Sequence, residues 1–262
     1  RKTYMDLKLN GKNALITGGS RGLGRQCALS LATEGVNVAI CGRTPETLEN
    51  TKADLETAGA KVITITGDIS EPNKAKEIHA KATSELGHID ILVNNVGGTL
   101  SREDISGTNL DDFRGTFDIN LFGGYELMRL VIPHMQKQSW GRIINIASIW
   151  GREYGGNISY MSAKAALIGA TKHAAVSLGK YGILVNSIAP GSIAHPQGSW
   201  ERFQNNNSPE VVEQFISDNL PLGKFGWPEP VGDLVAFLSS DRAGTITGTC
   251  IPVDGGQGIS MI

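Results

Sequence analysis

Tyr160 and Lys164 lie one helical turn apart in the stretch Ser-Tyr-Met-Ser-Ala-Lys-Ala-Ala, within a helix that we predict from Tyr160 to Leu178. Side chains four residues apart on a helix share one face. A phenol ordinarily ionises near pH ~10, and a neighbouring ammonium group favours the phenolate and lowers its pKa. The pair is therefore a candidate proton donor and acceptor at neutral pH. Because Tyr-x-x-x-Lys also occurs on helices by chance, other residues must support this interpretation.

Ser148 stands twelve residues before Tyr160, at the end of a strand predicted from Arg142 to Ala147. A hydroxyl group in that place can donate a hydrogen bond to a carbonyl oxygen and hold the carbonyl for hydride attack. The alternative is a serine that caps the following loop. A nucleophilic serine is excluded, because Ser148 lies outside any Gly-x-Ser-x-Gly turn and no histidine and acid complete a recognisable triad.

A glycine-rich turn follows the first predicted strand, residues 12–17, and precedes a helix that continues to about Thr33. Glycines let the chain turn tightly and bring backbone amides close to a pyrophosphate, and the positive end of the helix favours the anion. The turn is therefore predicted to bind a dinucleotide, the alternative being a glycine-rich turn without a ligand. The predicted contacts in this turn are Gly18, Ser20, Arg21, Gly22, Leu23 and Gly24.

The second predicted strand, Val36 to Cys41, is followed by Gly42 and Arg43 and carries no carboxylate at its end. An acidic residue there would accept hydrogen bonds from the adenosine ribose and would repel a 2′-phosphate. Arg43 and Arg21 instead offer two guanidinium groups, which suit a phosphate dianion. We therefore predict NADP(H) as the cofactor. The alternative is two solvated arginines, with NAD(H) accepted because nothing repels it.

Strands alternate with helices along the chain, and strands such as the one ending Ile-Leu-Val at residues 91–93 are fully apolar. The alternation predicts parallel βαβ units, and apolar strands suit a sheet covered on both faces. We predict an α/β fold: one Rossmann domain over residues 1–262 with a doubly wound parallel sheet of about seven strands. The remaining strands are predicted at 62–66, 89–93, 183–188 and 249–253, and the remaining helices at 45–58, 72–87, 110–138, 210–218 and 228–239, with an irregular substrate loop at about 195–225.

Composition limits the classes of partner. Charged residues make up 19% of the 262 residues and the formal net charge is -2, so electrostatics gives no reason to expect a nucleic acid or an anionic membrane. No apolar run approaches the ~20 residues of a membrane span, and the first five residues precede no apolar segment typical of a secretory signal. The three cysteines are typical of buried thiols in a reducing compartment. We therefore expect a cytoplasmic protein, and the scattered histidines predict no metal site.

A set of motifs spans the chain from Gly11 to Gly256. They are Thr17-Gly18-x-x-x-Gly22-x-Gly24, Asp68, Asn94-Asn95-x-Gly97, Asn120, Ser148, Tyr160-x-x-x-Lys164, Asn186 and Pro190-Gly191-x-Ile193. In this order they resemble the short-chain dehydrogenase/reductase family. The segments 221–226 and 253–256 are most similar to its bacterial 3-oxoacyl-(acyl carrier protein) reductase branch. The resemblance implies an oxidoreductase that transfers a hydride between NADP(H) and a carbonyl or secondary alcohol, in a small molecule or an acyl thioester, and that assembles as a homotetramer.

The resemblance also implies roles for individual residues. Tyr160 would be the general acid/base, Ser148 would stabilise the substrate oxygen, and Lys164 would lower the tyrosine pKa and hold the nicotinamide ribose. Asn120 would hold a water that links Lys164 to solvent, the alternative being a structural amide. The implied cofactor contacts beyond the glycine turn are Arg43, Asp68, Ile69, Asn94, Gly97, Tyr160, Lys164, Pro190, Gly191 and Ile193, with helix capping as the alternative for Asp68.

One position departs from the family's pattern. Two residues after Ile193 the family usually has a threonine that contacts the carboxamide or the pyrophosphate, whereas this chain has His195. Imidazole can also donate a hydrogen bond but is larger, so the local cofactor contact and the geometry of the substrate loop are expected to differ. We expect a surface or lid residue at this position, in preference to an acid–base catalyst.

The substrate itself is not specified by these motifs. We expect Trp150, Arg152 and Tyr154 and the loop holding Trp200 and Phe203 to wall its pocket, or to be packing residues. Three other functions compete with a carbonyl reductase. A sugar-nucleotide epimerase or dehydratase is disfavoured, because those enzymes usually carry Thr-Gly-x-x-Gly-x-x-Gly, whereas this chain has Thr17-Gly18-x-x-x-Gly22-x-Gly24. A catalytically silent NAD(P)-binding scaffold is disfavoured by the complete set of four catalytic residues, and an NAD-dependent alcohol, polyol or sugar dehydrogenase would differ in its measured cofactor preference.

Overall fold

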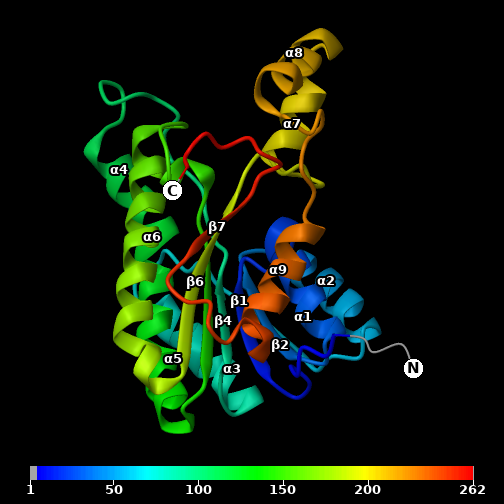
Figure 1. Ribbon diagram of the computed structural model, residues 1–262, viewed down its shortest axis with the longest axis vertical. Helices are drawn as coiled ribbons and strands as arrows, with labels where there is room; N and C mark the ends of the chain where they lie inside the picture. The colour runs from blue at the N-terminus through cyan, green and yellow to red at the C-terminus, as the bar shows by residue number, and fades with distance from the viewer. Residues whose placement is uncertain (1–4, 262) are drawn as a thin grey trace.

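Seven parallel strands form one sheet in the order β3-β2-β1-β4-β5-β6-β7 (Figure 1). This computed structural model describes residues 5–261, so the expectation about a secretory signal rests partly on residues outside the described range. The strands are β1 (Asn13–Thr17), β2 (Asn37–Gly42), β3 (Val62–Thr66), β4 (Ile91–Asn94), β5 (Gly141–Ile146), β6 (Ile183–Pro190) and β7 (Cys250–Val253). The predicted α/β fold with a doubly wound parallel sheet is confirmed. Strand order reverses between β1 and β4, and sheets of this kind bind ligands beside that point, at the carboxyl ends of the strands.

Helices cover both faces of the sheet (Figure 1). One face is covered by α1 (Gly22–Thr33), α2 (Pro45–Thr57) and α9 (Glu229–Ser239), and the other by α3 (Lys74–Leu86), α5 (Gly123–Gln138) and α6 (Ile158–Leu178). In β1, Ile16 belongs to the core under α1 and α9, and its neighbour Leu15 belongs to the core on the other face. Successive side chains of a strand point to opposite faces, so strands covered on both faces are mainly apolar, with a few buried polar residues such as Asn145 and Asn186.

The long helix predicted at 110–138 changes its winding near the middle. α4 (Leu110–Phe117) continues into a π-helical turn, Asp118–Phe122, which continues directly into α5. π-Helical turns are rare overall, but those that occur are often found at functional sites. The turn contains the buried side chain of Asn120, so the deviation from regular α-helix falls on a residue that the sequence assigns to the site.

The segment predicted as irregular at 195–225, called the lid below, contains two helices. α7 (Ser199–Asn206) and α8 (Pro209–Asn219) stand beyond the carboxyl edge of the sheet, at the top of Figure 1. The prediction of a short helix at 210–218 is confirmed, but the prediction of irregular chain before it is wrong. The reason is a cluster of aromatic rings with centroids 4.9 to 6.4 Å apart, which gives α7 an apolar side to bury: Trp200, Phe203, Phe215 and Phe225.

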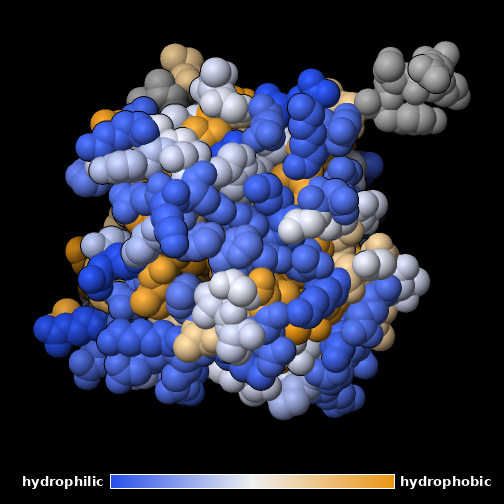
Figure 2. Space-filling view, turned by 90° about the horizontal axis from the view of Figure 1, so that it is seen from below, coloured by the Kyte–Doolittle hydropathy of each residue, from blue (hydrophilic) through white to orange (hydrophobic). Residues whose placement is uncertain are grey.

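The opposite edge of the sheet presents a different surface. Seen from below Figure 1, this face of the molecule is mainly hydrophilic, with hydrophobic residues in patches that polar residues interrupt (Figure 2). Among residues 5–261, no helix combines the length and the apolar character that crossing a membrane requires.

Candidate active site

The turn between β1 and α1 has the backbone geometry of an anion site. Gly18 and Gly22 have φ angles of +63° and +55°, in the region that glycine adopts without steric cost. Gly24 approaches the turn so closely that a Cβ on it would collide with the carbonyl oxygen of Gly18. α1 begins without a side-chain cap and without an acidic residue in its first turn. Its first N–H groups therefore have no partner within the helix and favour negative charge, so the turn fits a dinucleotide phosphate.

We expect Gly24→Ala to raise the cofactor Kd at least tenfold and to lower the Tm by about 5 °C, because the added methyl group meets backbone atoms of Gly18 that cannot move aside. Gly179→Ala is the matched control. Gly179 ends α6 in a helical conformation, and a Cβ on it would have no neighbour within 4 Å. Thermal unfolding and fluorescence titration with NADPH measure both quantities. If Gly24→Ala had the cofactor Kd and the Tm of the wild type, this would contradict the close approach of Gly24 to the backbone of Gly18.

Arg43 and Asp68 face each other at the ends of β2 and β3. Nη1 of Arg43 lies 3.6 Å from Oδ2 of Asp68, while Oδ1 of Asp68 accepts hydrogen bonds from the backbone N and the hydroxyl of Ser70, at 3.0 and 2.6 Å. Partial burial raises the pKa of Asp68, but the hydrogen bonds from Ser70 and the charge of Arg43 outweigh it and hold the pKa below its usual value. Asp68 does not cap α3, because the N-cap of that helix is Asn73.

The turn after β4 is fastened to the glycine-rich turn by Asn95. Its backbone N donates to Oγ1 of Thr17 at 2.9 Å, and its side chain donates to the carbonyl oxygen of Thr17 at 3.0 Å. The side chain of Asn94 points into the core instead, where Nδ2 donates to Oδ1 of Asn145 at 2.9 Å. Asn94 therefore joins β4 to β5 through its side chain.

Ser148, Tyr160 and Lys164 come together at the end of β5. The hydroxyl of Ser148 forms a hydrogen bond with the phenol of Tyr160. Lys164 is 2% exposed, and its Nζ donates to the carbonyl oxygen of Ile146 at 2.8 Å. The same Nζ lies 5.6 Å from the centroid of the Tyr160 ring. The hydroxyl, the phenol and the amine are thus grouped at one end of β5.

Asn120 and Gly97 complete this cluster. Nδ2 of Asn120 donates to the carbonyl oxygens of Gly98 and Thr116, at 2.6 and 2.7 Å. A Cβ on Gly97 would lie 2.9 Å from Nζ of Lys164 and 3.1 Å from Oδ1 of Asn120. Because both polar atoms border the same small space, the π-helical turn and the turn after β4 bring Asn120 close to the lysine.

Asn157 is a positioning residue that was not among those predicted from the sequence. It is the N-cap of α6: its Oδ1 accepts from the backbone N of Tyr160 at 2.9 Å and from Oγ1 of Thr99 at 3.1 Å. The sequence signal that could have identified it is an asparagine three residues before the tyrosine, at the start of a predicted helix, where asparagine is a preferred N-cap residue.

Trp150 meets the Tyr160 ring edge-on, with centroids 6.3 Å apart. The side chain of Tyr154 is 93% exposed, so it does not wall a pocket in this chain.

Burial dominates the electrostatics of the cluster. It raises the pKa of Tyr160, with the hydrogen bond from Ser148 acting in the opposite direction. It lowers the pKa of Lys164 to about 7. The pKa of Tyr160 is thus raised, whereas the sequence led us to expect that the lysine would lower it; burial is the larger of the two causes, and the lysine is not among them. Tyr160 keeps its proton at neutral pH, which suits a proton donor.

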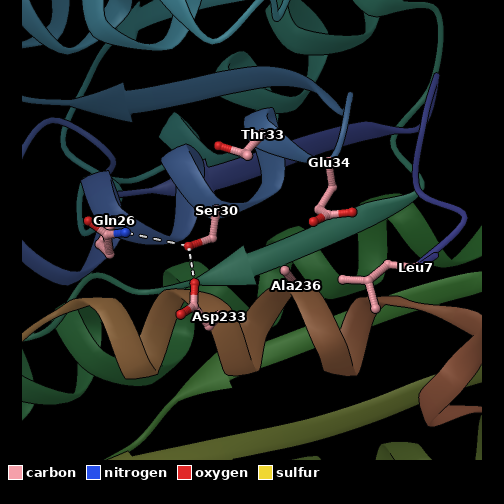
Figure 3. A pocket seen from close by; sticks show the side chains of 7 residues that line it. All are labelled: Leu7, Gln26, Ser30, Thr33, Glu34, Asp233 and Ala236. Atoms are coloured by element: carbon pink, nitrogen blue, oxygen red, sulfur yellow. Dashed lines mark hydrogen bonds between the residues drawn. The ribbon is translucent and has the colours of Figure 1, made fainter. Parts of the chain in front are cut away.

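A shallow pocket between α1 and α9 is not a second candidate for the cofactor-binding site (Figure 3). The side chains of Glu34 and Asp233 both line it, which disfavours a ligand that carries phosphate. Ser30 already donates to Asp233 at 3.0 Å and pairs with Gln26, so these polar groups satisfy one another.

Comparison with known proteins agrees with this geometry. A family model described as enoyl-(acyl carrier protein) reductase matches residues 18–257. The chain belongs to the short-chain dehydrogenase/reductase family. It is 36% identical to levodione reductase of Leifsonia aquatica over 248 residues, covering 93% of this chain and 92% of the relative. It is 34% identical to a 3-oxoacyl-(acyl-carrier-protein) reductase of Thermotoga maritima over 252 residues, covering 95% and 99%.

Solved structures of this family have the same fold. The crystal structure of levodione reductase superimposes with a TM-score of 0.88 at 33% identity, covering 95% of this chain and 98% of that one. An NADPH-dependent reductase involved in bacilysin biosynthesis gives 0.89 at 31% identity, covering 95% and 99%. The resemblance drawn from the sequence motifs is thus confirmed.

Proposed function

We propose that this short-chain dehydrogenase/reductase reduces a ketone or 3-oxoacyl carbonyl with NADPH, and oxidises the corresponding alcohol in the reverse direction. The observation that carries the proposal is the hydrogen-bonded pair of Ser148 and Tyr160 beside the buried amine of Lys164, at the strand ends next to a turn that fits a dinucleotide. The names of the relatives, levodione reductase and 3-oxoacyl-(acyl-carrier-protein) reductase, support the same reaction class.

Each side chain of the cluster has a separate task. When bound, the reduced cofactor supplies the hydride that the carbonyl carbon gains. Ser148 donates a hydrogen bond to the carbonyl oxygen and holds it beside Tyr160, which gives its proton to that oxygen as negative charge develops there. Lys164 then gives a proton to the phenolate and regains one from solvent through a water that Asn120 would hold. The ketone thus gains one hydride and one proton, and becomes an alcohol.

The cofactor is proposed to lie along the strand ends. Backbone groups of Gly18–Gly24 would hold the diphosphate, and Arg21 with Arg43 would hold the 2′-phosphate. Asp68 and Ile69 would flank the adenine, and Asn94 and Gly97 would meet the adenosine ribose through their backbone. Pro190, Gly191 and Ile193 would line the nicotinamide. Ile193 is held in place for this, because it is buried and its strand-like backbone pairs with Gly226.

Arg43→Ala should lower kcat/KM with NADPH by ten- to a hundredfold and change kcat/KM with NADH by less than about threefold, because one charge-assisted hydrogen bond to the 2′-phosphate is lost. Arg25→Ala is the matched control: this arginine lies on the outer side of α1 and pairs with Asp54 at 2.7 Å. Steady-state kinetics with both cofactors measures the effect. A wild-type preference for NADH, or equal losses with both cofactors, would contradict the assignment of NADP(H).

A panel of ketones, 3-oxoacyl thioesters and alcohols, assayed through NADPH absorbance, tests the reaction class. Turnover of one carbonyl class supports a reductase. Tight cofactor binding without turnover of any member would instead support a catalytically silent scaffold.

The remaining proposals concern the whole molecule. We propose that residues 1–262 form a single domain that works in the cytoplasm as a homotetramer. α5 and α6 expose the apolar side chains of Tyr125 and Val176, which are 50% and 76% accessible. A contact with another subunit would cover exposed apolar side chains of this kind. Light scattering on the purified protein measures the oligomeric state.

A further inference from the structure

Gln257, in the segment after β7, forms two hydrogen bonds with Ser192. Its Oε1 accepts from the backbone N of Ser192 at 2.7 Å, and its Nε2 donates to the hydroxyl of Ser192 at 2.9 Å. Because a backbone N–H can only donate, the amide oxygen faces that N–H and the amide nitrogen faces the hydroxyl. Ser192 is buried and Gln257 is half-buried. One amide thus satisfies two polar groups of a single buried residue, which an apolar side chain of the same size cannot do.

Ser192 is the middle residue of a tight turn after β6. The backbone N of Ile193 donates to the carbonyl oxygen of Gly191 at 3.0 Å, which is the hydrogen bond of a three-residue turn. The carbonyl oxygen of Ser192 accepts from the backbone N of Gly226 at 3.0 Å. Hydrogen bonds of Ser192 therefore join this turn to Gly226 and to Gln257. A shift of Ser192 would move both of its neighbours, against which the nicotinamide is proposed to lie.

The chain after β7 is folded so that Gln257 returns to this turn. The two carboxylate oxygens of Asp254 accept from the backbone N of Gly256 and of Gly258, each at 2.9 Å. Gly256 has a φ angle of +81°, which glycine adopts without steric cost. A Cβ on Gly191 would lie 2.7 Å from Cβ of Asp254 and 2.7 Å from Oε1 of Gln257. The two segments are therefore in close contact.

The same segment is also attached to the loop that leads from Ser148 to α6. Oε2 of Glu153, in that loop, accepts from the backbone N of Ile259 at 2.7 Å and of Ser260 at 2.5 Å. The chain after β7 thus contacts two loops of the proposed site. One follows the serine that would hold the substrate oxygen, and the other would line the nicotinamide. Hydride transfer requires the donor and the acceptor to be held in a narrow range of positions, so a segment that joins these loops can affect the reaction.

We propose that Gln257 is a positioning residue for the nicotinamide: through Ser192 it holds the turn Gly191–Ile193 in the position that the ring requires. This inference rests on the proposed function, because it requires a nicotinamide at the end of β6. Gln257 acts through Ser192 and not on the reacting atoms. Its loss should therefore weaken binding of the nicotinamide half of the cofactor and leave binding of the adenosine half unchanged.

Isothermal titration calorimetry compares each cofactor with the fragment that lacks its nicotinamide: NADPH with 2′-phospho-ADP-ribose, and NADH with ADP-ribose. The measured quantity is the ratio of Kd for the fragment to Kd for the cofactor. We expect this ratio to fall about tenfold in Gln257→Met, because the new side chain has a similar length but lacks the amide that holds the turn. Gln136→Met, in the last turn of α5, is the matched control and should keep the wild-type ratio.

A double-mutant cycle tests whether Gln257 acts through Ser192. Ser192→Ala removes one of the two hydrogen bonds, so it should lower the ratio about threefold in the wild type and no further in Gln257→Met. Additive effects of the two substitutions would overturn the inference, because Gln257 would then act by another route. If Gln257→Met does not fold, Ser192→Ala decides alone, and an unchanged ratio in that variant overturns the inference.

The remaining outcomes separate this inference from the proposed function. A ratio that is the same in Gln257→Met and in the wild type would overturn the role of Gln257 and leave dinucleotide binding intact. Equal losses of affinity for the cofactor and for its fragment would also overturn that role, because they indicate a general disturbance of the fold. Failure of the wild type to bind any of the four ligands would overturn the proposed function itself, and this inference with it.

Discussion

Tyr160→Phe should lower kcat for carbonyl reduction by about a thousandfold and leave the Kd for NADPH within about threefold of the wild type. The substitution removes only the phenolic oxygen, so the ring keeps its edge-on contact with Trp150 and leaves no cavity. The carbonyl oxygen then loses its proton donor, while Ser148 still offers a hydrogen bond. NADPH absorbance with a reducible ketone gives kcat, and fluorescence titration gives Kd.

The pH dependence of the wild type gives a second readout of the same residue. Burial raises the pKa of Tyr160, so the phenol is protonated at neutral pH, and the rate of reduction should decline only in alkaline solution as the phenol loses its proton. Tyr181→Phe is the matched control, because Tyr181 follows the far end of α6. Near-normal turnover of Tyr160→Phe would show that another group delivers the proton.

Local patterns in the sequence were sufficient to predict the scaffold of this site. The sheet follows from strands whose residues are mainly apolar on both faces, as at Leu15 and Ile16. The glycine-rich turn could be predicted because its backbone leaves no room for a side chain, as at Gly24. The grouping of Ser148 and Tyr160 follows from the fact that the strand and the next helix end and begin at one edge.

Features that depend on distant neighbours could not be predicted in this way. Asn94 points into the core because Asn145, on the adjacent strand, offers it an acceptor. α7 forms because its aromatic side chains meet Phe215 and Phe225, which come later in the chain. The tyrosine pKa rises because desolvation outweighs the hydrogen bond from Ser148. Each depends on which groups are buried together, and spacing along the chain does not specify that.

Lys164→Met should abolish most of the activity and at the same time stabilise the fold, because the lysine amine is held where its charge is unfavourable. Burial lowers the pKa of Lys164 from its ordinary value of 10.5 to about 7. That difference of about 3.5 pH units corresponds to about 5 kcal/mol in the free energy of unfolding. Methionine removes this cost, but it leaves the carbonyl oxygen of Ile146 without its donor, which costs about 1–3 kcal/mol. We expect a net gain of about 2 kcal/mol near pH 7 and a Tm higher by about 4–8 °C.

The sign of the pH dependence distinguishes this cause from a general packing effect. Below pH 7 the amine is charged in both the folded and the unfolded chain, so the wild type bears the full cost. Between about 7 and 10.5 the unfolded chain binds the proton and the folded chain does not, so wild-type stability rises with pH through this window. The Tm advantage of Lys164→Met should therefore be largest near pH 6 and shrink towards pH ~10. Lys172→Met, on the exposed side of the same helix, should show no such trend. A Tm difference between Lys164→Met and the wild type that stays constant across this range would mean that the amine is not held at an energetic cost. A lower Tm for Lys164→Met near pH 6 would mean the same. The role of the lysine charge in returning protons to Tyr160 would then need another explanation.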